Sequence, residues 1–318
     1  MKNIALIIVV LILSILSIFI GVATIDVSEI WIAGSISNKI IFLSRLPRTI
    51  SIVVSGFGIS ICGLIMQQIT MNKFVSPSTA GTSDGAKLGV LIALLVFPTS
   101  GVLFKMVLSV IFALISTFLF VKIIQDFKGR NTVLVPFVGL ILGGIISSIT
   151  TFFAYKSDLI QNVNSFLFGN FSSVMSGNYE LLYLSIPFVV FAFIYANKFT
   201  IVGLGEDITT NLGLSYQSIV RIGFIIVCTV SALIMVTIGS IPFLGLVVPN
   251  LVTMFLGDNL AKNSLLTGLS GSVFLLLCDL FGRLIIFPHE LPIGMVVGVI
   301  GSGVFLVMIM RRNKFAKS

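Results

Sequence analysis

The chain contains 318 residues, of which 57% are hydrophobic and only 9% are charged, and its mean hydropathy is +1.18. A soluble domain carries about 25% charged residues, so this composition excludes a water-soluble protein and indicates an integral membrane protein. The net charge of +8 comes from Lys and Arg in short connections between apolar runs, so it does not indicate a nucleic-acid-binding surface.

The apolar runs are continuous rather than alternating, and roughly 20 apolar residues span a bilayer as a helix. We therefore predict an all-α membrane protein with one transmembrane domain, 1–318, whose approximate halves are 1–178 and 179–318. The ten expected membrane segments are 4–22, 46–69, 86–97, 103–125, 133–155, 181–196, 219–238, 244–256, 264–287 and 293–310. The first segment could be a signal peptide, but its apolar core is longer than usual, which favours a retained helix.

Segments 86–97 and 244–256 are too short to cross the bilayer core as straight helices, at about 1.5 Å per residue. Each is third in its half of the chain, and each is bordered by Pro and Gly. Matched short, interrupted segments indicate a transporter with an inverted internal repeat, although Gly and Pro are also common in membrane helices generally. Residues with an expected structural or hinge role are Pro77, Gly81, Gly85, Gly245, Pro249, Pro292 and Gly294.

The basic residues predict the orientation of the chain. With both termini in the cytoplasm, thirteen Lys and Arg residues face inward and six face outward, in agreement with the positive-inside rule. The six outward residues are Lys39, Arg45, Arg48, Lys105, Lys156 and Arg283. The polar interval 203–221, with the adjacent acids Glu206 and Asp207, is then cytoplasmic. It is either a surface that an external partner grips or an ordinary solvated loop.

Few residues could carry chemistry. Asp279 lies well inside an apolar run, and Arg283 follows four residues later on the same helix face, which favours a structural ion pair over a proton relay. His289 is the single histidine and has no companions for a metal site, so we expect no bound metal and no catalytic residues. The stretch 81–87 lacks the spacing of an ATP-binding phosphate loop, so any ATP and magnesium must be used by a separate subunit.

Arg45-Leu46-Pro47-Arg48 opens the second segment at the expected outer face. Two arginines one turn apart can bind carboxylates of a partner. On physical grounds alone, they could equally be anchors at the end of a membrane helix.

Four blocks of sequence together resemble one family. They are Arg45-Leu46-Pro47-Arg48 with 60–68 (SICGLIMQQ), 72–86 (NKFVSPSTAGTSDGA), 205–214 (GEDITTNLGL), and 239–250 (GSIPFLGLVVPN) continuing through 257–259, Asp279, Arg283 and 290–294 (ELPIG). The chain thereby resembles the permease subunits of ABC importers for iron–siderophore complexes, haem and cobalamin (FecCD- and BtuC-like). Two positions depart from the family pattern: Lys73 replaces a usual Pro, and Asn250 stands where His is frequent.

The resemblance implies a BtuC-like type II importer permease of about ten helices in a bacterial cytoplasmic membrane. It also implies a second permease subunit, identical or paralogous, two cytoplasmic ATPases and an extracellular binding protein. The ATPase-coupling loop would comprise Gly205, Glu206, Asp207, Leu212 and Gly213. Arg45, Arg48 and Arg283 would meet acidic residues of the binding protein. Similarity to catecholate-siderophore permeases of Gram-positive bacteria predicts an iron(III)–catecholate cargo.

Two other classes of function remain open from the residues alone. An ion-coupled secondary transporter would use Asp279 as its coupling acid and would work as a single chain. A membrane-embedded enzyme is the weaker alternative, because the sequence contains no cluster of acids or histidines.

Overall fold

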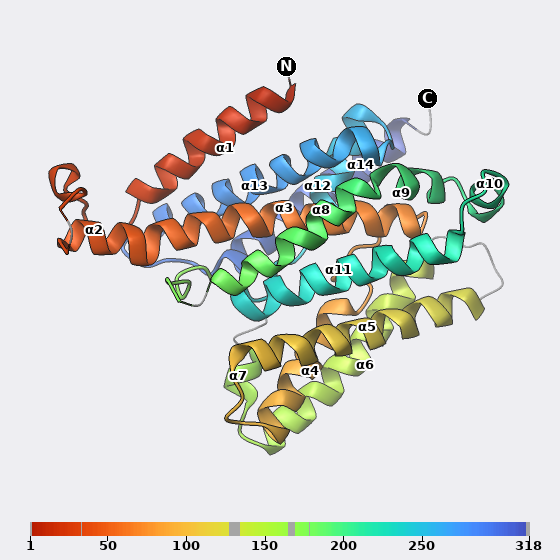
Figure 1. Cartoon of the computed structure of the whole chain (residues 1–318), viewed down its shortest axis with the longest axis horizontal. Helices are drawn as coiled ribbons and strands as arrows, with labels where there is room; N and C mark the ends of the chain where they lie inside the picture. Colours follow the sequence, from red (N-terminus) through yellow and green to blue (C-terminus); the bar gives the residue numbers. More distant parts are fainter. Residues whose placement is uncertain (1, 33, 127–133, 165–168, 178, 316–318) are drawn as a thin grey trace.

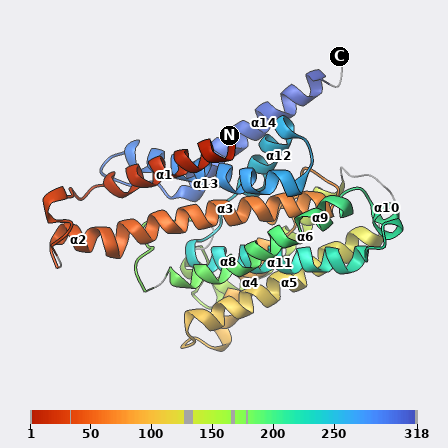
Figure 2. The same cartoon turned by 45° about the horizontal axis from the view of Figure 1, so that its top comes forward.

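A computed structural model describes residues 2–32, 34–126, 134–164, 169–177 and 179–315. These residues form helices and connections without any strand. The longer helices run roughly along one molecular axis (Figures 1 and 2). Their bounds are α1 Lys2–Phe19, α3 Leu46–Ile69, α4 Thr82–Val96, α5 Val102–Asp126, α6 Leu134–Lys156, α8 Ser185–Ile194, α11 Tyr216–Ile238, α12 Leu244–Leu256, α13 Leu260–Leu284 and α14 Ile293–Phe315.

Short helical segments join the longer ones. They are η1 Val27–Glu29, α2 Ile36–Ile40, the π-helical η2 Ile41–Arg45, α7 Ile160–Asn164, the 3-10 helix η3 Glu180–Leu184, α9 Ala196–Val202 and α10 Glu206–Asn211. The helices α2, η2 and α3 continue into one another, which gives a single helical stretch from Ile36 to Ile69.

Five helical stretches are long and apolar enough to cross a membrane: Ile36–Ile69, Val102–Ile124, Val135–Lys156, Tyr216–Ile238 and Leu260–Leu284. A sixth span results if η3 with α8 and the following α9, bent by 61° relative to each other, are counted as one. The chain is thus a multi-pass, all-helical membrane protein in the part that the structure describes. The predicted ten crossings and the inverted repeat stay predictions, because helices such as α12 are short.

The core is organised around α3, which packs against α13, α12, α11 and α1. Small residues allow α3 and α13 to approach closely: a Cβ atom added to Gly56 would lie 2.7 Å from the carbonyl oxygen of Gly271. The Ser272 hydroxyl donates a hydrogen bond to the Val53 carbonyl at 2.8 Å across this contact. Such small-residue contacts are typical of membrane helices, where packing and interhelical hydrogen bonds replace the hydrophobic driving force.

A second group, α4 to α7, lies on the other side of α11 from α3 (Figure 1). The helix α11 joins the groups, because it contacts α3 and also α5 and α4. Many large apolar side chains on α5 and α6 are exposed, as expected of helices that face lipid.

Candidate functional site

The predicted partner-contacting residues lie at opposite ends of the molecule. The segment α2, next to the predicted arginines, is at one end of the long axis, and α10, in the predicted coupling loop, is at the other (Figures 1 and 2). This separation is what a transporter needs if different partners bind on the two sides of a membrane.

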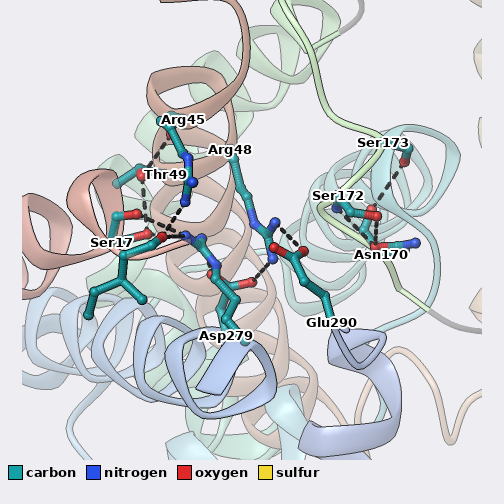
Figure 3. A network of polar contacts seen from close by, with 11 residues as sticks. Ser17, Arg45, Arg48, Thr49, Asn170, Ser172, Ser173, Asp279 and Glu290 are labelled. Atoms are coloured by element: carbon teal, nitrogen blue, oxygen red, sulfur yellow. Dashed lines mark hydrogen bonds and ion pairs between the residues drawn. The ribbon is translucent and has the colours of Figure 1, made fainter. Parts of the chain in front are cut away.

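At the α2 end, the structure joins five charged residues, called here the charged cluster: Arg45, Arg48, Asp279, Arg283 and Glu290 (Figure 3). Arg48 on α3 bridges two acids, since its Nη2 atom lies 2.8 Å from Asp279 Oδ1 and its Nη1 atom lies 2.6 Å from Glu290 Oε2. The predicted pair of Arg283 with Asp279 is present through the second carboxylate oxygen. Asp279 is therefore held by a guanidinium group at each oxygen.

The charged cluster also fixes the end of α1. Arg283 Nη1 donates to the carbonyl oxygens of Ser17 at 2.8 Å and Ile20 at 2.9 Å, and its Nη2 donates to Ser17 Oγ at 3.1 Å. Arg45 donates to the Ile20 carbonyl and, at 3.4 Å, to the Ala23 carbonyl. The last carbonyls of a helix lack intrahelical partners and carry its negative dipole end, so cations stabilise them.

The burial of these arginines bears on their predicted contact with a partner. Arg45, Arg48 and Arg283 are only 7%, 8% and 2% exposed, whereas meeting acidic residues of a partner directly requires an open guanidinium group. Their Nη donors are instead turned toward acids and carbonyls of the same chain. A docking role of the three arginines stays a prediction, and in this conformation it could only be indirect.

The same geometry argues against Asp279 as an ion-coupling acid. A coupling acid must exchange its ion with a pathway, but the Asp279 side chain is 1% exposed and both its oxygens accept from arginine. Two adjacent guanidinium groups occupy both carboxylate oxygens and compete with any other cation for them.

At the opposite end, α10 is bounded by two glycines in conformations that other residues rarely adopt. Gly205 precedes the helix with φ 110°, and Gly213 follows it with φ 75°. The helix is tied to α9 by the buried Thr209, whose hydroxyl donates to the carbonyls of Gly205 at 2.7 Å and Ile201 at 3.3 Å. The segment is therefore a small, anchored helix.

The free side of α10 combines apolar and acidic groups. Leu204, Ile208 and Leu212 recur every fourth residue and are 59%, 46% and 60% exposed. Glu206 and Asp207, both exposed, occupy its first turn, where the positive end of the helix dipole favours acids. Exposed apolar side chains beside charges, at a polar end of the molecule, are typical of a protein-binding surface.

Predicted hinge residues from the two halves of the chain, Pro77 and Gly245, lie next to each other beside α3. Pro249 lacks an N–H group, so it cannot donate the helical hydrogen bond that the carbonyl of Gly245, one turn earlier, would accept. This carbonyl faces Gly63 on α3, where an added Cβ atom would lie only 1.8 Å away. Gly245 in turn faces Pro77, whose Cδ atom is 3.4 Å from the position of an added Cβ.

The other hinge residues serve local turns and close contacts. Gly81 has φ 73° directly before α4, and its carbonyl accepts from Ser116 Oγ at 2.8 Å. Gly85 lets α4 approach α5, because an added Cβ atom would lie 2.6 Å from the carbonyl oxygen of Phe112. Pro292 and Gly294 begin α14, and the Gly294 amide donates to the Gly169 carbonyl at 3.0 Å.

One contact was not foreseen from the sequence. Asn250 Nδ2 donates to the carbonyl of Lys73 and to that of Leu246, both at 2.7 Å. Lys73 and Asn250 are the two positions that depart from the family pattern, and they are neighbours in space. The acceptor on Lys73 is a backbone carbonyl, so no side-chain pattern at position 73 could have indicated this contact.

Among the described residues, no three His, Cys, Asp or Glu side chains are grouped in a way that could hold a metal ion. The three cysteines, Cys62, Cys228 and Cys278, are free and buried.

The model of the FecCD transport family matches residues 8–311. The chain is 52% identical to the petrobactin import system permease protein YclN of Bacillus subtilis (strain 168), over 99% of this chain and 100% of that protein. It is 37% identical to the petrobactin import system permease protein FatD of Bacillus anthracis, over 97% of this chain and 90% of that protein.

One solved structure is described as an inward-facing conformation of a metal-chelate type ABC transporter. It has a TM-score of 0.83 and 21% sequence identity, over 97% of this chain and 98% of that one, which shows a shared fold. The family match extends over nearly the whole chain, and the resemblance found in the sequence motifs is thereby confirmed. This chain belongs to the FecCD transport family.

Proposed function

We propose that this chain is the permease subunit of an ATP-driven importer that carries an iron(III)–siderophore complex across the cytoplasmic membrane, with a catecholate-type siderophore as cargo. The observation that carries this proposal is the 52% identity, over the full length, to a permease named for petrobactin import. A 38% identical relative is named for ferric-anguibactin transport, which supports siderophores as the cargo class. The catecholate type comes from the resemblance in sequence.

The proposal includes the partners of the family: a second permease, two ATPase subunits and an extracellular binding protein. The exposed face of α10 supports an ATPase contact, because it offers apolar and acidic side chains on a helix anchored to α9. An anchored helix moves as one body, so a displacement imposed by the ATPase reaches α9 and α11 and allows near-rigid rocking of the longer helices.

The binding protein is proposed to dock at the α2 end. Here the charged cluster would act from beneath the surface, by holding α1, α3 and α13 together in the shape that the partner recognises. Glu290 contributes the more accessible part of the cluster, with a side chain that is 24% exposed.

The test is uptake by a strain that lacks only this chain and by the same strain after complementation. Labelled ferric petrobactin, a ferric hydroxamate, haem and cobalamin would be compared. We expect the strain to lose uptake of the ferric siderophore that has a catecholate group and to keep uptake of the other three ligands. Complementation should restore this uptake, and the restored uptake should depend on a functional partner ATPase. Normal uptake of all four ligands in a strain without a redundant permease would overturn the proposal, and loss of the hydroxamate alone would overturn the catecholate assignment.

A further inference from the structure

A groove of about 270 Å³ lies between α5 and α11. Its α5 side is formed by Phe118, Val121 and Lys122, and its α11 side by Tyr216, Gln217, Val220, Arg221 and Phe224. The two helices pack against each other and run in opposite directions, so the end of α5 lies beside the start of α11, near α10 (Figure 1). The groove is thus at the same end of the molecule as the proposed ATPase contact.

Two cations face this groove from helices that are about a hundred residues apart in sequence. Lys122 and Arg221 are both exposed, and neither forms an ion pair with a residue whose side chain the structure describes. By contrast, Lys73 and Lys87 each have an acidic partner. The polar side of the groove therefore carries two cations, and Gln217 and Tyr216 add uncharged polar groups.

The rest of the groove is apolar and lies deeper along the helices. Phe118 precedes Lys122 by one turn, and Phe224 follows Arg221 by about one turn, so both aromatic rings lie on the side toward the middle of their spans. Val121 lies between Phe118 and Lys122 on α5, and Val220 is next to Arg221 on α11. The groove thus has charged groups at the helix ends and an apolar part toward the centre of the spans. This order matches that of headgroup and acyl chain in a bilayer.

The surroundings indicate that the groove opens toward lipid. Ile115 and Leu119 on α5 and Ile225 on α11 are large apolar residues with exposed side chains on the two helices that form the groove. Such side chains on membrane spans are covered by hydrocarbon. A freely soluble anion would meet the cations but would leave the apolar half of the groove without a ligand.

We propose that this groove binds one anionic phospholipid, with its phosphate between Lys122 and Arg221 and one acyl chain along Val121, Val220 and the two phenylalanine rings. Basic pockets between membrane helices at the headgroup level bind anionic lipids in this way. The site would anchor the base of α11, the helix that directly follows the α10 segment. It is independent of the cargo and of the ATPase contact, so it can fail while the proposed function holds.

The test measures lipid retention by the purified full-length chain with native mass spectrometry, using phosphatidylglycerol and phosphatidylcholine of identical acyl chains. We expect the wild type to retain phosphatidylglycerol preferentially. In the double variant Lys122→Gln/Arg221→Gln this preference should fall by roughly fivefold per cation removed, the factor expected for a basic residue near an anionic lipid surface. The matched control Lys105→Gln/Lys156→Gln, two cations on α5 and α6 outside the groove, should keep the wild-type preference.

Two further arms separate a lipid groove from simpler explanations. Val121→Trp fills the apolar part and keeps both cations, so it should also lower phosphatidylglycerol retention. Unchanged retention in this variant, or in the double Gln variant, overturns the proposal. Displacement of phosphatidylglycerol from the wild type by inorganic phosphate, but not by chloride at equal ionic strength, also overturns it and indicates a site for a soluble anion.

Discussion

At the scale of single residues, the charged cluster contains three arginines and two acids, and Asp279 forms an ion pair with both Arg48 and Arg283. The i,i+4 pair of Asp279 with Arg283 could be predicted from sequence, because residues four apart share a helix face. The contact of Arg48 with Asp279 joins residues 231 apart and could not be predicted in the same way. The charged cluster therefore combines a local contact with a long-range one, and nearly all of its charged groups are buried.

We predict that Asp279→Asn strongly destabilises the chain. The amide cannot compensate two buried guanidinium groups, and removing one partner of a buried ion pair costs roughly 3–5 kcal/mol. The measurement is thermal unfolding of the purified protein in detergent. Glu290→Gln is the control: it loses a single pairing of a more accessible acid, so its transition should shift clearly less. Equal unfolding temperatures for Asp279→Asn and the wild type would show that these ion pairs do not stabilise the fold.

The burial of the arginines also gives a test of their predicted role in docking. Replacing Arg48 by Gln should lower the unfolding temperature of the permease, because Asp279 and Glu290 lose their shared cation. If the effect on the binding protein is indirect, the affinity of the remaining folded permease should have the same salt dependence as the wild type. A salt dependence that becomes markedly weaker in the variant would instead indicate a direct ion pair with the partner.

At the scale of elements, α10 shows a segment whose ends follow from sequence. Glycines at 205 and 213 enclose the six residues of α10 and Leu212, and the structure gives both glycines positive φ angles. The face that α10 exposes depends on tertiary structure, because burial of Thr209 against α9 turns Ile208 and Leu212 outward. The exposed stripe is therefore a consequence of packing, although its spacing is visible in the sequence.

We predict that Gly213→Arg abolishes uptake and ATPase association while the chain is still inserted in the membrane. Open space surrounds Gly213, so a large side chain would project outward onto the proposed contact, and the φ of 75° adds backbone strain. Gly213→Asn is the matched control, since Asn tolerates positive φ and is small. Co-purification of the ATPase and siderophore uptake are measured together. Normal association in the Arg variant would remove Gly213 from the contact.

The contact between α3 and α12 gives a second prediction at this scale. Gly63→Ala should disrupt folding, because the new methyl group would lie 1.8 Å from the Gly245 carbonyl oxygen and backbone cannot move aside easily. Gly144→Ala on α6 is the control, since an added Cβ there meets nothing within 4 Å of this chain. Expression level and size-exclusion profile in detergent report the outcome. Similar behaviour of the two variants would show that α3 and α12 have more freedom than the structure indicates.

At the scale of the whole molecule, the two ends along the helices should face different sides of the membrane. The charge distribution predicts that α10 is cytoplasmic and that the connection containing Trp31 is extracellular. The structure places α10 and α2 at opposite ends, in agreement with this arrangement (Figure 2). It does so without fixing which end is inside.

We predict that Trp31→Cys is labelled in intact cells by a membrane-impermeant maleimide, and that Asn211→Cys is labelled only after permeabilisation. Trp31 is 89% exposed and Asn211 ends α10, so both positions are accessible. The native cysteines are buried, so the wild type should stay unlabelled in both conditions and serves as the control. The opposite labelling pattern would invert the topology.

The sequence by itself determined that this is a helical membrane protein of one permease family, because hydropathy and motif spacing are local properties of the chain. It also located the α10 segment and the Pro and Gly positions, since a missing N–H group or a positive φ is a property of one residue. Only the tertiary structure decided that Arg48 shares Asp279 with Arg283, that Asn250 bonds to the Lys73 carbonyl, and that Lys122 and Arg221 face one groove. These contacts join residues that are far apart in sequence, and helix packing, which no local pattern encodes, sets which helix faces meet.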